Sequence, residues 1–188
     1  DEHGYHDLAT VFQAVSLFDD ITVSPNPGGG IELTISGEGA DVVPTDHTNI
    51  AWRAAELLAR HLGTVADVSI HIAKGIPVAG GMAGGSADAA ASLRALNRLW
   101  GLGWPDERLA ALGVKLGADV PVCIASRPAR MEGVGEVLGP APSLPRFGLL
   151  LANPREALAT PAVFRARQGG FSPRANLPVG WGNASAMA

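Results

Sequence analysis

The chain has 188 residues, of which 47% are hydrophobic and 17% charged, and its formal net charge at pH 7 is −4. This apolar content at low net charge excludes an intrinsically disordered chain, and the length allows one full domain, or one domain and the start of another. The single cysteine, Cys123, excludes a disulfide framework and a cysteine-based zinc site, and no apolar run approaches the roughly 20 residues of a membrane span. We therefore expect a cytoplasmic protein without a membrane partner. The absence of a Lys/Arg cluster argues against nucleic acid as a partner.

The first part of the chain alternates between strand and helix patterns. Mixed or alternating apolar residues predict strands over residues 8–15, 21–23 and 31–35, and the Pro- and Gly-rich turn at 25–30 predicts that the last two form a hairpin. Apolar residues at helical spacing predict a helix over 48–62, which Gly63 ends. A further strand is expected over 68–73.

The second part is richer in helix. Ala- and Leu-rich segments predict helices over 86–100 and 105–116, the latter ended by Gly117. The apolar run 147–151 predicts a buried strand, and a short helix is expected over 160–167. Because strands and helices are mixed without strict β-α-β alternation, the fold class expected is α+β.

A glycine-rich loop between the strand at 68–73 and the helix at 86–100 is the most informative segment. Four of its six residues from Gly80 to Gly85 are glycines, which lack Cβ and allow main-chain amides to approach a bulky anion closely. The helix that follows offers unpaired amides and the positive end of its dipole to phosphate. Neither the Walker nor the dinucleotide fingerprint fits. The alternative is a plain turn capped by Ser86, with Asp88 favouring the helix dipole.

Residues 77–86 resemble the phosphate loop of the GHMP kinases. Further pieces follow in family order and narrow the resemblance to the branch that acts on a cytidine diphosphate-linked methylerythritol. They are Gly4-Tyr5-His6 with Leu8, Thr10, Phe12 and Gln13, then Thr48-Asn49-Ile50, Leu116–Pro121, Glu132–Glu136 and Thr160–Phe164. The resemblance covers residues 2 to about 168.

The resemblance implies a fold and a reaction. Residues 1–146 would form the GHMP kinase N-terminal nucleotide-binding domain, of the ribosomal protein S5 domain 2-like type, and residues 147–188 the start of a ferredoxin-like C-terminal domain and a tail. The family's first strand, with its Ala-Lys-x-Asn motif and catalytic lysine, and its later glycine-rich motif are absent, which implies truncation at both ends. The implied reaction is ATP-dependent phosphorylation of the 2-hydroxyl of 4-diphosphocytidyl-2-C-methyl-D-erythritol in non-mevalonate isoprenoid biosynthesis, by a monomer or homodimer.

Asp119 is the candidate catalytic residue. The resemblance implies that its carboxylate accepts the proton of the substrate hydroxyl, a step for which a carboxylate base is suited. The residues alone equally allow a helix cap, because Asp before Val-Pro is a good N-cap.

The nucleotide is expected on the loop and on two flanking residues. For Asn49 and Lys74, a helix cap and a solvated strand end are equally open alternatives. The expected nucleotide-binding set is Pro77, Val78, Ala79, Gly80, Gly81, Met82, Ala83, Gly84, Gly85, Ser86 and Ala87, with Asn49 and Lys74.

The substrate site is implied by the resemblance. Tyr5 and Phe164 would sandwich the cytosine ring and His6 would hydrogen-bond its polar edge, since offset stacking and an imidazole suit a nucleobase. Phe12 would close the pocket, with ordinary strand core as the alternative. No resident metal site is expected, because no His, Cys or Asp cluster has ligand spacing, and Mg²⁺ would arrive with ATP.

Two other functions stay open at this stage. One is a different GHMP kinase that acts on mevalonate or homoserine, against which Gly4-Tyr5-His6 and Phe164 argue. The other is a non-catalytic nucleotide-binding fragment, which the missing lysine and end motifs favour.

Overall fold

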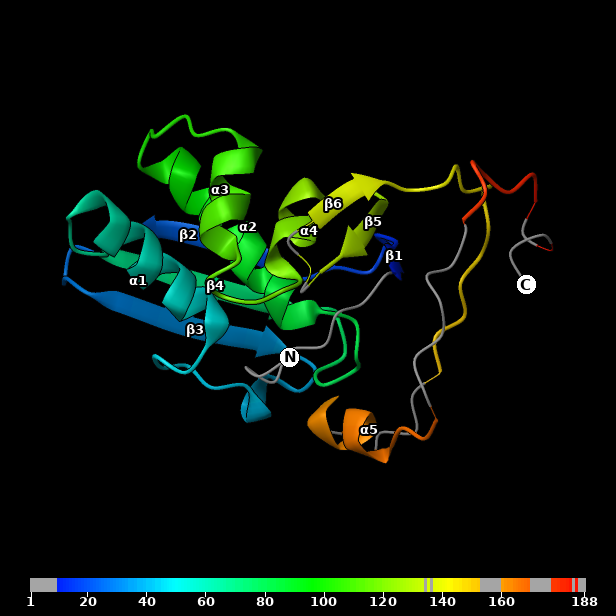
Figure 1. The fold of residues 1–188 in the computed structure, drawn as a ribbon. Coiled ribbons are helices and arrows are strands. Elements are labelled where there is room, and N and C mark those ends of the chain that lie inside the picture. Colours follow the sequence, from blue (N-terminus) through cyan, green and yellow to red (C-terminus); the bar gives the residue numbers. More distant parts are fainter. Residues whose placement is uncertain are drawn as a thin grey trace.

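The computed structural model describes residues 10–133, 135, 137–152, 160–169, 177–183 and 185 (Figure 1). Strands and helices are mixed along the chain, which confirms the α+β class. The elements are β1 (Thr10–Phe12), β2 (Asp20–Pro25), β3 (Ile31–Gly37), the 3-10 turn η1 (Ala40–Val42), α1 (Ile50–Leu62), β4 (Val68–Lys74), α2 (Gly84–Leu99), α3 (Asp106–Gly113), α4 (Val120–Ala125), β5 (Ala129–Glu132), β6 (Val137–Pro140) and α5 (Thr160–Ala166).

One sheet has the strand order β2-β4-β3, so the predicted β2–β3 hairpin is wrong in its pairing. Strand β4 lies between the two, antiparallel to β2 and parallel to β3. Its alternate side chains Val68, Ile70 and Ile72 are almost completely buried, so this most apolar strand takes the central position. The turn after β2 bonds to the residue that precedes β4 instead of closing a hairpin, since the Asn26 amide donates to the Asp67 carbonyl at 3.0 Å.

The second sheet is antiparallel, with the order β1-β5-β6. Its strands have three or four residues each. The sequence pattern did not indicate β5 and β6, because strands this short carry too few alternations to be recognised. Val122 of α4 packs with Ala129 and Met131 beneath this sheet, and Phe12 lies against them.

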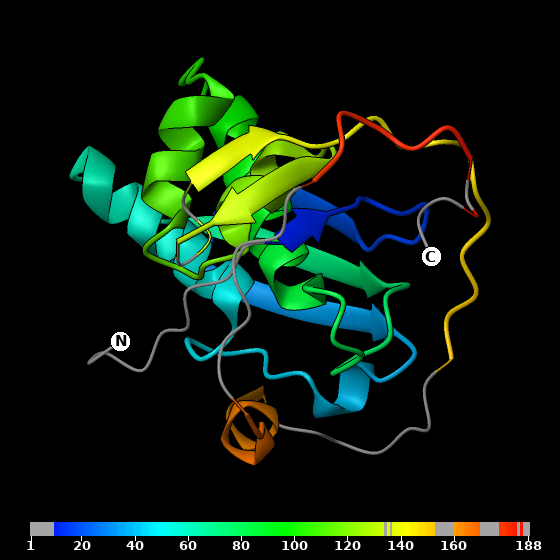
Figure 2. The same cartoon turned by 45° about the vertical axis from the view of Figure 1, so that its right-hand side comes forward.

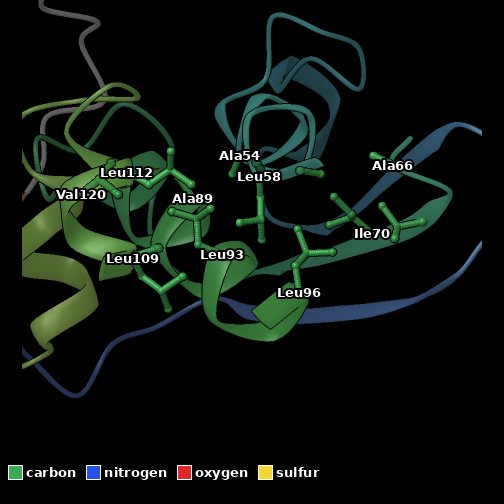
Figure 3. Packing of buried hydrophobic residues seen from close by; sticks show 14 of the residues in the cluster. Ala54, Leu58, Ala66, Ile70, Ala89, Leu93, Leu96, Leu109, Leu112 and Val120 are labelled. Atoms are coloured by element: carbon green, nitrogen blue, oxygen red, sulfur yellow. The ribbon is translucent and has the colours of Figure 1, made fainter. Parts of the chain in front are cut away.

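Helices α1 and α2 pack on the β2-β4-β3 sheet and enclose the main core (Figure 3). Leu58 of α1 and Leu93 and Leu96 of α2 are fully buried in the same cluster as Ile70 of β4. Small residues such as Ala54 and Ala89 are also fully buried, which allows the two helices to lie close together. The core therefore holds α2, at whose start the glycine-rich loop ends, on the sheet.

Helix α1 ends as its sequence predicts. Asn49 is the N-cap, whose side chain accepts a hydrogen bond from the Ala51 amide, and Gly63 is a left-handed C-cap with φ of 68°. Helices α2, α3 and α5 also confirm the predicted helices, with bounds that differ by a few residues. Within the described ranges, no helix is long and apolar enough to cross a membrane.

The predicted buried strand at 147–151 is wrong. This segment lies outside both sheets (Figure 2), and Leu150 is 93% exposed. A strand is stable only where a neighbour accepts its backbone hydrogen bonds and covers its apolar face, and no described strand does so here. The nearby chain makes one isolated bridge, between Ser143 and Gly180.

Candidate active site

The glycine-rich loop and Asp119 line the same cavity, which has a volume of about 860 Å³. The loop contributes Gly81, Met82 and Ala83, followed by Ala87 and Asp88 of α2. Ala118 and Asp119 reach the same cavity from the turn before α4. Ser86 lies close to this turn, because a Cβ built on Gly117 would stand 3.9 Å from its Oγ. Residues about 35 positions apart in the chain are therefore neighbours here.

The loop reaches α2 through a sequence of left-handed residues. Ala79, Gly81 and Ala83 have φ values of 56°, 70° and 55°. The Gly80 amide is used within the loop, where it donates to the Pro77 carbonyl at 3.2 Å. Since a left-handed backbone costs a residue with a Cβ roughly 1–2 kcal/mol, Ala79 and Ala83 are strained at positions that favour glycine.

The N-terminus of α2 lacks a side-chain cap. Ala83 is the N-cap and makes no side-chain hydrogen bond, while Ser86 lies inside the first turn. The plain turn capped by Ser86 is therefore wrong. The amides of Gly84, Gly85 and Ser86 have no acceptor within the helix, because the first amides of an α-helix precede its hydrogen-bond ladder. Open amides at the positive end of a helix dipole suit a phosphate group.

Asp119 immediately precedes α4 but does not cap it. Its backbone is in the right-handed region, with φ of −87° and ψ of −10°, and its side chain makes no cap hydrogen bond. The carboxylate is thereby left available on the cavity wall. Gly135, with φ of 104°, packs closely against the Ala118 backbone and so restricts the position of this turn.

Cys123 lies on the same wall between two carboxylates. Burial, and then the charges of Asp119 and Asp88, raise the pKa of its thiol to about 12. The thiol therefore stays protonated at neutral pH and is a poor nucleophile.

Lys74 lies in a buried ion-pair cluster with Asp19 and Asp88. Its Nζ is 2.5 Å from Oδ2 of Asp19 and 3.0 Å from Oδ2 of Asp88, and all three side chains are at most 6% exposed. Burial, assisted by the nearby Asp19, raises the pKa of Asp88 to about 7 in spite of Lys74. Burial opposes ionisation of Asp19 too, but amide hydrogen bonds from Ile76 and Gly75 and the bond from Lys74 hold its pKa below the ordinary value.

The remaining expected site residues lie in different places. Asn49 is 6% exposed and, besides capping α1, donates to the Pro44 carbonyl at 2.8 Å. Phe12 both lines the cavity and packs on the cluster beneath the second sheet. Tyr5 and His6 lie outside the described residues, and the side chain of Phe164 does as well.

The sequence reading missed two charged residues of the cavity wall, Asp19 and Arg94. Arg94 shares a face of α2 with Asp88 and Ala91, six and three positions earlier, so helical spacing was a usable signal. Asp19 had no such signal, because its partner Lys74 is 55 positions away. No three His, Cys, Asp or Glu side chains of the described ranges are grouped to hold a metal ion.

Known proteins resemble the chain in sequence and fold. Residues 49–127 match the GHMP kinases N terminal domain. The chain is 50% identical over 181 residues to 4-diphosphocytidyl-2-C-methyl-D-erythritol kinase of Mycobacterium marinum, and 50% identical over 179 residues to that of Nocardia farcinica; the matches cover 94% and 93% of this chain, and 56% and 58% of the relatives. The chain thus spans about half the length of the curated relatives it matches.

The structural comparison agrees with the sequence comparison. A crystal structure of 4-(cytidine 5'-diphospho)-2C-methyl-D-erythritol kinase superposes with a TM-score of 0.69 at 37% identity, covering 95% of this chain and 62% of that one. Residues 49–127 thus form a GHMP kinase N-terminal domain, and the chain resembles the kinases that carry this domain in both sequence and fold.

Proposed function

We propose that this protein phosphorylates the 2-hydroxyl of 4-diphosphocytidyl-2-C-methyl-D-erythritol with ATP, a step of non-mevalonate isoprenoid biosynthesis. The names of the curated relatives support this substrate. The observation that carries the proposal is that Ala83 and Ala87, on either side of the uncapped first turn of α2, and Asp119, which makes no cap hydrogen bond, line one cavity.

The start of α2 is proposed to hold the phosphates of ATP. A Cβ on Gly85 would meet only Ile50, at 3.6 Å, so the main chain is open to a bulky ligand there. The amides of Gly84, Gly85 and Ser86 stand at the positive end of the helix dipole, which favours a phosphate group. Because the described residues offer no grouped metal ligands, we expect Mg²⁺ to be held mainly by the phosphate oxygens, with the charge stabilisation that this supplies.

Asp119 is proposed to accept the proton of the acceptor hydroxyl. That oxygen forms a bond to the γ-phosphorus, the bond to the bridging oxygen breaks, and ADP leaves. Phosphoryl transfer depends mostly on positioning and charge stabilisation, so a general base adds about 10²–10⁴-fold to the rate. Phe12, Tyr5, His6 and Phe164 remain our proposals for the cytidine side of the site.

The test is ADP formation by the full natural chain, with the cytidine diphosphate-linked substrate, mevalonate and homoserine compared at equal concentration. Asp119→Asn keeps the shape of the side chain but removes the base. We expect kcat to fall by about 10²–10⁴-fold while nucleotide binding in a thermal-shift assay is unchanged. Turnover of mevalonate or homoserine alone would overturn the substrate, and an Asn variant with normal kcat would overturn the role of Asp119.

The domain division is also a proposal. Leu149 and Leu150 are 57% and 93% exposed, which is unusual for neighbouring leucines and supports a separate unit from about residue 147. We further propose a cytoplasmic enzyme.

A further inference from the structure

Three buried charged side chains connect the two ends of the phosphate loop. Asp19 lies just before β2, Lys74 ends β4 where the loop begins, and Asp88 is in the second turn of α2 after the loop ends. The Lys74 ammonium bridges the carboxylates of Asp19 and Asp88. One cation thus joins strand β4 to helix α2 across the base of the loop.

The entry to the loop is held a second time by Asp19. Its Oδ1 accepts hydrogen bonds from the amides of Gly75 and Ile76 at 2.6 and 2.8 Å, the first two residues after β4. Charge-assisted bonds of this kind are about twice as strong as neutral ones. At the exit, Asp88 interacts with Lys74 and with the side chain of Asp19, while its Oδ1 is buried without a hydrogen-bond partner among the described residues.

Lys74 has no free ammonium to offer a ligand. Its side chain is 6% exposed, and Gly84 lies close to it, since a Cβ there would stand 3.8 Å from Nζ. The same position would bring that Cβ to 3.2 Å from Ile76. Gly84, the first residue of α2, therefore lies beside the buried ammonium, with Ile76 on the same side.

We propose that Asp19, Lys74 and Asp88 form a latch that fixes both ends of the phosphate loop, and that Lys74 acts on the nucleotide through this latch and not by contact. The proposal rests on nucleotide binding at the loop, as proposed above. In this proposal Lys74 is a positioning residue. The latch holds the first-turn amides of α2 in place before the nucleotide binds, so that binding does not have to order them.

The first test needs no nucleotide. Amide hydrogen exchange of the full natural chain is compared with that of Asp88→Ala. This variant removes the ion pair between Lys74 and Asp88 at the exit of the loop and keeps the ion pair between Lys74 and Asp19. Ser92→Ala is the matched control, since Ser92 is buried one turn later on α2 with an unpartnered Oγ. We expect faster exchange confined to residues 75–87 in Asp88→Ala alone. Unchanged exchange, or loss of protection spread evenly over α1 and β4, would overturn the latch.

The second test separates the latch from direct contact. For Asp88→Ala, which lacks the Lys74–Asp88 ion pair, the latch predicts that the KM for ATP rises by about 10-fold while kcat and the KM for the acceptor change little. Asp88→Asn keeps an oxygen acceptor for Lys74 and should restore a nearly normal KM. Direct contact predicts the opposite, because Asp88→Ala would leave the ammonium paired with Asp19 alone and so more available to the nucleotide. A KM for ATP that is unchanged or lower therefore overturns the proposal. If the unaltered protein does not use ATP, the proposed function fails, and hydrogen exchange still decides whether the latch exists.

Discussion

Replacing Asp88 by Asn should change how the stability of the protein depends on pH. In the native protein Asp88 is 4% exposed, and its pKa is raised from 3.8 to about 7, first by burial and then by Asp19, against the opposing charge of Lys74. Asn has nearly the same shape and can accept from Lys74, but it does not titrate. The variant therefore removes one proton equilibrium and little else.

The sign follows from where each state holds the proton. Between pH 3.8 and about 7 the native carboxyl is protonated while the unfolded one is ionised, so the native state binds more protons and its stability falls as pH rises. A shift of about three units corresponds to at most about 4 kcal/mol above the native pKa. The pKa of Asp19 is lowered, so Asp19 changes the stability below this pH range. The pKa of Lys74 is raised, so Lys74 changes the stability above it.

The assay is urea unfolding of both proteins at steps from about pH 5 to about pH 8. Asp88→Asn should gain stability relative to the unaltered protein by about 1.4 kcal/mol per pH unit at the steepest part, then level off above about pH 7. The contributions of all other titrating groups cancel in the difference between the two free energies of unfolding. For Ser92→Ala, the curve of unfolding free energy against pH should run parallel to that of the unaltered protein. Parallel curves for Asp88→Asn as well would refute the raised pKa of Asp88.

Three further substitutions test single features of the site. Asn49→Ala removes the hydrogen bond from the Ala51 amide and the bond to the Pro44 carbonyl. The free energy of unfolding should fall by about 1–2 kcal/mol, with no change in the KM for ATP. A raised KM at unchanged stability would show that Asn49 contacts the nucleotide instead. Ala83→Gly relieves a left-handed alanine and should raise the unfolding free energy by up to about 1 kcal/mol, and a loss of stability in the same measurement would contradict the strain. Gly135→Ala places a Cβ against the Ala118 carbonyl at a residue whose φ is 104°. Because this should displace Asp119, kcat should fall by about 10-fold or more while the melting temperature drops only moderately. An unchanged kcat would show that this contact does not hold the turn.

Local patterns predicted those parts of the molecule that depend on neighbours in sequence. Helix α1 begins at the Asn49 cap and ends at Gly63 because capping and a left-handed glycine act within a few residues. The glycine run before α2 likewise predicted a loop with open amides at a helix start, since the absence of Cβ is a property of the residues themselves. The α+β class and the resemblance to GHMP kinases depend on such local features taken in order.

Contacts between distant segments were decided only in the tertiary structure. The apolar alternation of β2 and β3 is correct, yet it carries no information on which strand lies between them, and β4 took that place because its side chains bury most completely. The segment at 147–151 shows the converse, since an apolar run becomes a buried strand only when a partner strand is present.

The site divides in the same way. The sequence by itself determined the glycine-rich loop and marked Asp119 as a candidate base, because both are recognisable within short motifs. Only the tertiary structure decided that they share a cavity, that Lys74 is enclosed by Asp19 and Asp88, and that the pKa of Asp88 is raised to about 7. The physical reason is that burial and charge proximity are properties of the space around a side chain, and residues 14 and 55 positions from Lys74 form that space.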